Sequence, residues 1–314
     1  MRRGWVRLAA SAAIFGVLVW RLGTGPFLDG VRTVDGRALA AAAGLALVTT
    51  VACAWRWKIV ASGLGVQLSL PGAVAAYYRS LFLNLTLPGG VVGDVHRGVS
   101  HGRDVSDVPR ALRGVAWERL AGQAVQAVVT VAVLLALPSP VQSSMPLIAI
   151  AAVAVAACVV LAARAHGRFW RAAVADIRDG LLARRAWLGV ALASAVVVVG
   201  HAATFVIAAR TAGVTEPTSR LLPLALLVML IGVVPSVAGW GPREGGAAWV
   251  FAAAGLGAHL GVTTAVAYGV MALVASLPGA AVLVVSWCRR TRLPVRAESR
   301  RRGSSTCLSA HTPS

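Results

Sequence analysis

Long runs of apolar residues dominate the chain, and most charged residues lie between them. The six runs without a marked break are Leu8 to Trp20, Ala38 to Trp55, Val115 to Leu137, Leu147 to Ala163, Trp187 to Ala209 and Val262 to Trp287. A helix needs about 17 to 25 apolar residues to cross the hydrocarbon of a bilayer. The first run follows an arginine-rich start and is similar to a signal peptide, but Arg21 follows it directly and no A-x-A cleavage site is present. The pattern predicts about six full transmembrane helices, the first of them uncleaved.

Two further apolar regions, Leu70 to Val92 and Leu221 to Leu256, contain residues that break helices. The breaks lie at Arg79, Asn84, Pro88, Gly89 and Gly90 in the first region, and at Pro235, Gly239, Gly241 and Pro242 in the second. Irregular backbone at membrane depth is tolerated only where it is buried in protein or lines a wet cavity. We therefore expect two re-entrant or broken helical hairpins, although the second region could equally form two short full spans.

The order of these elements repeats. Each half contains two spans, a broken hairpin and a further span, and the second half begins on the opposite face of the membrane. Pro88 and Pro235 occupy corresponding places, as do the spans that begin at Ala38 and Trp187. We expect inverted halves at about residues 5–137 and 145–288, an arrangement typical of secondary transporters that bind substrate at the repeat interface.

Composition supports the bilayer as solvent. Of the 314 residues 58% are apolar and only 13% are charged, whereas a soluble domain is about 45 to 50% apolar. A particle of this size cannot hide so much apolar surface from water. The predicted fold class is therefore an all-α polytopic membrane protein.

The arginines indicate the orientation, since short cytoplasmic loops carry an excess of Lys and Arg. With both termini inside, the inner segments hold 22 basic residues and the outer loops hold five. The domain prediction is a transmembrane domain over residues 1–288 and a basic, disordered cytoplasmic tail over residues 289–314. The net charge of +19 fits an anionic membrane surface, and we expect no nucleic-acid partner.

Several chemistries are disfavoured. Lys58 is the only lysine and does not stand in a P-loop, so the chain carries no Walker-type ATPase site. The four cysteines have no C-x-x-C spacing and the six histidines form no H-E-x-x-H motif. We predict no metal and no cofactor.

Ionisable residues inside apolar regions are costly, so each is a functional candidate. One cluster contains Asp94, His96, Arg97, Glu118 and Arg119, and a second contains Arg243 and Glu244. Arginines at broken helices suit phosphate oxygens, and Pro242 is favourable as the first residue of a helix whose amino end attracts anions. The predicted substrate-binding residues are Arg97, Arg119, Arg243 and Asn84. The candidates for proton coupling are Asp94, Glu118 and Glu244, and the predicted hinge positions are Pro88, Gly89, Gly90, Gly93, Pro235, Gly239, Gly241 and Pro242.

Simpler interpretations exist for some of these residues. Glu244 can complement a helix dipole, Asp94 can cap a short helix, and Glu118 can pair with an arginine. Four aromatic residues are interpreted as interfacial belts: Trp55, Trp57, Tyr77 and Tyr78.

The chain resembles the lysylphosphatidylglycerol synthase transmembrane family, also called flippase-like membrane proteins. The motifs that carry the resemblance are Arg56-Trp57, Phe82-Leu83-Asn84-Leu85-Thr86-Leu87-Pro88-Gly89-Gly90, Gly93-Asp94, Arg97, Glu118-Arg119, and Pro235 followed by Gly239-Trp240-Gly241-Pro242-Arg243-Glu244-Gly245. The similarity extends over about residues 5 to 288 and departs from the usual pattern at Val92 and Pro242. It implies a bacterial inner-membrane protein that handles lipids. The family's soluble aminoacyl-transferase domain has no counterpart after Trp287.

The leading functional hypothesis is a lipid translocator for an anionic or amphiphilic lipid, with membrane lipids as its partners. A homo-oligomer or a partner lipid-modifying enzyme is compatible with it. The alternatives are a membrane-embedded lipid-phosphate transferase or phosphatase, with Asp94 or Glu118 as base and His96 beside it, and a nonenzymatic partner in lipid export.

Overall fold

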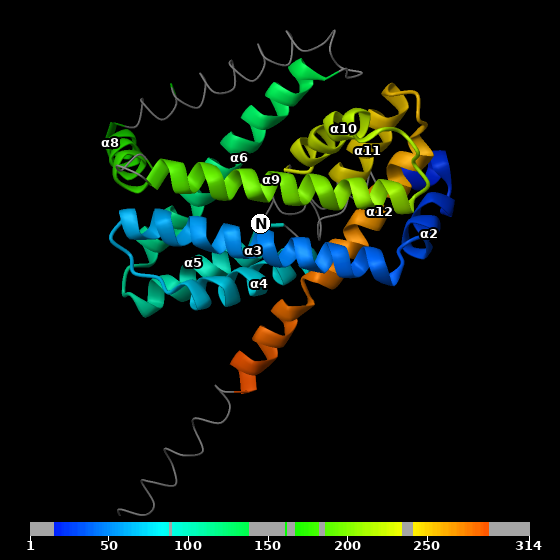
Figure 1. Cartoon of the computed structure of the whole chain (residues 1–314). Coiled ribbons are helices and arrows are strands. Elements are labelled where there is room, and N and C mark those ends of the chain that lie inside the picture. The colour runs from blue at the N-terminus through cyan, green and yellow to red at the C-terminus, as the bar shows by residue number, and fades with distance from the viewer. Residues whose placement is uncertain are drawn as a thin grey trace, which may run out of the picture.

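The computed structural model describes residues 16–87, 90–137, 161, 167–181, 186–233 and 241–288, and this part of the chain consists of helices and their connections (Figure 1). Four described helices are long and apolar enough to cross a membrane. They are α3 (Gly36–Gly63), α6 (Val108–Ala136), α9 (Ala186–Thr211), and α12 (Ala258–Ala275) with its continuation to Cys288. The predicted all-α polytopic membrane fold is confirmed.

These four helices match four of the six predicted full spans. The last predicted span is less regular than the sequence suggested, because the helix is interrupted at Ser276. Pro278 lies two residues further on and lacks the N–H that a continuous helix would use. The predicted spans Leu8 to Trp20 and Leu147 to Ala163, and the tail over residues 289–314, lie wholly or mostly outside the described residues.

Helices α3 and α9 lie side by side and antiparallel in the middle of the molecule (Figure 1). Apolar residues are found on all sides of both helices, as expected for helices buried in protein and lipid, although α3 also carries Arg37, Arg56 and Lys58. Small residues let their backbones come close: a Cβ on Gly200 would lie 2.3 Å from the side chain of Thr49. Tight contact through small residues is how membrane helices associate when lipid removes the hydrophobic driving force.

Two shorter helix pairs form the hairpins expected from the broken apolar regions. The first pair is α4 (Leu70–Thr86) and α5 (Val92–Asp104), and the second is α10 (Thr218–Ile231) and α11 (Pro242–Ala253). In Figure 1 the first hairpin begins and ends at one end of the helix bundle, whereas the second begins and ends at the opposite end. The predicted region Leu70 to Val92 holds only α4 and the turn, because the returning helix begins at Val92 and extends to Asp104.

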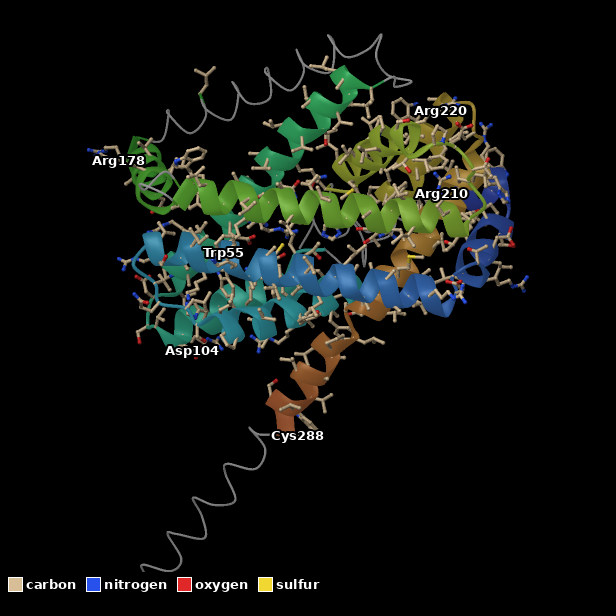
Figure 2. All side chains as sticks on the ribbon, in the orientation of Figure 1. Trp55, Asp104, Arg178, Arg210, Arg220 and Cys288 are labelled. Carbon is tan, nitrogen blue, oxygen red and sulfur yellow. The ribbon has the colours of Figure 1, made fainter. Side chains whose placement is uncertain are left out.

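Figure 2 shows which charged residues mark the two ends of the bundle. Asp104 and Arg178 lie at the end from which the first hairpin enters, and Arg210 and Arg220 lie at the other. Two smaller elements complete the description: α2 (Gly25–Arg32), which packs on α12, and α8 (Gly167–Asp176), which continues into the π-helical turn Ile177–Leu181. The two hairpins therefore approach the middle of the bundle from opposite ends.

Candidate functional site

A buried carboxylate, Glu118 on α6, is the centre of a charged network between four helices. Its side chain is completely enclosed. Arg56 on α3 donates from Nε to Oε1 over 2.8 Å, and Arg97 on α5 donates to Oε2 over 2.7 Å. The hydroxyl of Tyr77 on α4 donates to Oε1 over 2.9 Å. Two arginines and a tyrosine thus stabilise one carboxylate inside a membrane domain, where an isolated charge would be costly.

Asp94, in the first turn of α5, extends this network. Its Oδ1 accepts hydrogen bonds from Arg97 Nε at 3.0 Å and from Ser80 Oγ at 3.2 Å, and its Oδ2 accepts one from Asn84 Nδ2 at 2.8 Å. Arg119 forms an ion pair with the same Oδ2. Asp94 therefore joins the two arms of the first hairpin to α6, and it is not an N-cap of α5.

Two aromatic rings lie against the guanidinium of Arg97. The ring of Trp57 lies 4.6 Å away and the ring of Tyr77 lies 4.2 Å away, at cation–π distances. The interpretation of these two aromatic residues as interfacial belts is wrong, because both are buried against a charge. Trp55, by contrast, is 37% exposed on the outer surface of the bundle. Aromatic rings with one polar function suit either setting, and local sequence does not distinguish them.

Two glycines make room for the network. A Cβ on Gly122 would lie 2.6 Å from the guanidinium of Arg56, which also donates to Ser194 on α9 over 3.0 Å. A Cβ on Gly93 would lie 2.1 Å from the carbonyl oxygen of Ser80, so the arms of the first hairpin touch there. The N–H of Gly93 donates to Asn84 Oδ1 over 2.8 Å. Asn84 thus bonds both to Asp94 and to the backbone at the hairpin turn.

The second hairpin carries a simpler polar group at the start of α11. Gly241 has a φ of +108°, a conformation that favours glycine, and Pro242 is the first residue of the helix, as predicted. Glu244 accepts a hydrogen bond from the N–H of Gly241 over 2.7 Å and another from Arg243 Nε over 3.0 Å. The guanidinium of Arg243 lies over the ring of Tyr268 at 5.4 Å. This carboxylate therefore finds its partners in its own first turn.

A cavity of about 520 Å³ lies between these groups, with walls from both hairpins and from α6, α9 and α12. Three of the four predicted substrate-binding residues line it: Asn84, Arg119 and Arg243. Arg97, the fourth, does not, and its side chain has no exposed surface. The cavity (the polar cavity below) thus brings together one arginine from each predicted half.

Four further residues of the polar cavity were not predicted as site residues: Gln123, Gln126, His201 and Tyr268. Tyr268 and His201 are hydrogen-bonded to each other, with the tyrosine hydroxyl 3.0 Å from Nδ1. Each of the four is a polar residue within a long apolar span, and that feature alone could have identified them. Arg56 was also missed as a site residue, because its partner Glu118 is 62 residues away.

The remaining candidates are dispersed. His96 is exposed on α5, and Gly90, with a φ of +63°, lines the polar cavity at the hairpin turn. Pro88, Gly89, Pro235 and Gly239 lie outside the described residues.

His101, outside the four candidate spans, packs edge-on against Trp57, with ring centroids 5.7 Å apart. Burial lowers the pKa of this histidine, and the nearby Asp104 carboxylate raises it by a smaller amount. Within the described ranges, no three His, Cys, Asp or Glu side chains gather as metal ligands.

The chain belongs to the family described as the lysylphosphatidylglycerol synthase TM region, which it matches over residues 4–279. The resemblance that the sequence motifs indicated is therefore confirmed over nearly the whole chain. No curated protein and no solved structure matches it. Membership establishes a membrane protein related to lipid handling.

Proposed function

We propose that this protein moves an anionic phospholipid across the membrane, and that the polar cavity receives its headgroup. The observation that carries the proposal is the position of Arg119 on α6 and Arg243 on α11, which line the same cavity. Guanidinium groups form paired hydrogen bonds with phosphate oxygens, so two of them facing one space suit a phosphate diester.

The charge balance of the network supports an anion. Five ionised side chains are connected by ion pairs, and they comprise three arginines and two carboxylates: Arg56, Arg97, Arg119, Asp94 and Glu118. One positive charge is therefore not compensated within the network. Arg119 is 40% exposed, whereas the side chains of Arg56 and Arg97 are enclosed. The excess charge is thus available at the cavity wall.

The surroundings suit a ligand that is partly hydrocarbon. Large apolar side chains are exposed along the outer surfaces of the spans, among them Leu47, Val128, Leu192 and Trp249. Such a surface is stable in contact with acyl chains. In our proposal the lipid enters sideways from the bilayer, and the two inverted halves rock against each other to expose the cavity to each side in turn. Gly90, at the turn of the first hairpin, also lines the polar cavity.

The proposed topology has both termini on the cytoplasmic side of a bacterial inner membrane. The positions of the arginines support it, since Arg178 and the pair Arg210 and Arg220 mark opposite ends of the bundle (Figure 2). The end near Arg178 belongs to the segments with the larger arginine excess. That end is therefore assigned to the cytoplasm.

Asp94 and Glu118 act in this proposal as counter-ions that position the arginines. Each carboxylate accepts hydrogen bonds from at least three side chains, which occupy its oxygen lone pairs. The same contacts give little support to the alternative of a lipid-phosphate transferase or phosphatase. A general base needs a free lone pair near the reacting proton, and His96 is exposed instead of lying beside the polar cavity.

The test is lipid movement in vesicles that contain the purified protein and a headgroup-labelled phosphatidylglycerol. Chemical quenching of the outer leaflet measures how fast inner-leaflet lipid becomes accessible. A double variant, Arg119→Gln with Arg243→Gln, should slow this movement by about tenfold or more, because each lost charge-assisted hydrogen bond is worth about 1.5 to 3 kcal/mol. Arg110→Gln is the matched control, since Arg110 is exposed, pairs with Asp107 in the first turn of α6 and does not line the polar cavity.

Wild-type protein that moves lipid no faster than empty vesicles contradicts the proposed function. Equal rates in wild type and the double variant contradict the site.

A further inference from the structure

A second, smaller cavity adjoins the polar one. It has a volume of about 80 Å³ and lies between α3, α4, α9 and α12. We call it the apolar cavity, because its exposed wall is mostly apolar, with Ala46, Leu81, Met271 and Ala275 among its lining residues. Hydroxyl-bearing residues, among them Thr49, Thr50 and Thr204, also line it. A single water needs about 10 to 15 Å³ of such space, so there is room for several methylene groups.

The two cavities share part of their wall. Leu81, Leu85, His201, Tyr268 and Ala272 line both. The hydrogen bond between Tyr268 and His201 therefore lies at the boundary, with arginines beyond it on one side and aliphatic side chains on the other. Polarity changes across this boundary as it does between the headgroup and the chains of a lipid.

We propose that the apolar cavity binds part of one hydrocarbon chain of the lipid whose phosphate lies in the polar cavity. The inference rests on the proposed function and adds to it a chain-binding site in the protein, while the other chain stays in the bilayer. The wall that the two cavities share and the arginines that line the larger one select this occupant. A separate apolar molecule would leave the arginines unused, and a free phosphate would leave the apolar cavity unused.

Filling the apolar cavity is the first test. Ala46→Phe places a ring in it, whereas Ala43→Phe adds the same ring on the exposed side of α3 and is the matched control. Two probes are compared by equilibrium binding: phosphatidylglycerol, and glycerophosphoglycerol, which has the same headgroup without chains. Ala46→Phe should weaken phosphatidylglycerol binding by tenfold or more and leave glycerophosphoglycerol binding unchanged. Ala43→Phe should change neither.

The outcomes separate this proposal from the proposed function. If the double arginine variant weakens both probes while Ala46→Phe weakens neither, the headgroup site stands and the chain site is wrong. If Ala46→Phe weakens both probes equally, the change acts through the fold, and the chain site is again wrong. If wild-type protein binds neither probe, the proposed function fails and the chain site fails with it.

A second experiment needs no variant and therefore decides the matter if Ala46→Phe does not fold. Wild-type protein is illuminated with a phosphatidylglycerol that carries a photoactivated diazirine in one acyl chain, and labelled residues are identified by mass spectrometry. We expect labels at Ala46 and Ala275 that excess unlabelled phosphatidylglycerol suppresses. Labels confined to lipid-facing residues of the same helix, such as Leu47 and Val48, would overturn the proposal.

Discussion

The two hairpins have similar shapes but are held in place by different forces. The first, α4–α5, is tied to α6 by the ion pairs Arg97–Glu118 and Arg119–Asp94, and Glu118 also pairs with Arg56 on α3. The second, α10–α11, packs through apolar side chains, and its fully buried members include Leu224, Val250 and Phe251.

This difference determines what a rearrangement of each hairpin would cost. Moving the first one separates buried charges, which leaves each of them without a partner in a medium of low dielectric constant. Moving the second one exchanges one set of apolar contacts for another, because Glu244 keeps its partners within its own helix turn. We therefore expect the second hairpin to be the mobile one during lipid movement, and the first to be the fixed one.

Glu118→Gln should have the largest effect on the first hairpin, because it removes the negative charge that pairs with both Arg56 and Arg97. Losing one partner of a buried ion pair costs about 3 to 5 kcal/mol, so we expect a large fall in the thermal unfolding midpoint in detergent. Glu216→Gln is the control, since Glu216 pairs with Arg220 at the surface, where a salt bridge is worth about 0 to 1 kcal/mol. Equal midpoints for the two variants would show that the network does not stabilise the first hairpin.

The second hairpin should respond to loss of packing volume. Phe251→Ala removes a fully buried ring that packs against Phe205, with ring centres 6.3 Å apart. We expect a loss of about 3 kcal/mol in unfolding free energy, mainly from lost dispersion contacts, because lipid weakens the hydrophobic contribution. Limited proteolysis should then cut within α10 or α11 before α4 or α5. Trp249→Ala, at a residue that is 54% exposed on the same helix, is the control; similar cleavage in both variants would contradict the prediction.

The smallest expected effect tests how tightly Arg56 is held. Gly122→Ala places a methyl group 2.6 Å from a guanidinium that Glu118 and Ser194 already fix. Such overpacking should cost about 1 to 3 kcal/mol, measured as a lower unfolding midpoint. Gly44→Ala on α3 is the control, because a Cβ at Gly44 would have no atom within 4 Å, and this change should have little effect. A Gly122→Ala protein as stable as wild type would mean that Arg56 can move away without loss.

Much of the fold could be predicted from sequence. A helix in lipid must form all its backbone hydrogen bonds internally, and it can be recognised as a run of apolar residues long enough to cross the bilayer. The runs at Ala38, Val115, Trp187 and Val262 correspond to four described spans. The broken regions correspond to the two hairpins, and the helix start at Pro242 follows from local preference alone. The break at Ser276 was missed because apolar residues continue on both sides of it. The extent of α5 was missed because this helix is polar and lies beyond the apolar region.

The candidate site was predictable only in part. Asn84, Arg119 and Arg243 stand out as polar residues in apolar sequence, and the polar cavity contains all three. Arg97 stands out by the same criterion, yet its side chain has no exposed surface and packs against Trp57 and Tyr77. A costly charge signals that a partner exists, but it does not say whether that partner is another side chain or a ligand.

Sequence by itself thus determined a helical membrane protein, the places where its helices break and the charges that need a partner, because each follows from the local cost of placing a residue in hydrocarbon. Tertiary structure alone decided which charges meet. Arg56 pairs with Glu118 across 62 positions, and the geometry that leaves Arg119 at a cavity while enclosing Arg97 depends on the contacts of α3, α5, α6 and α9. Pairing over such distances is set by how the helices pack, and no local pattern records it.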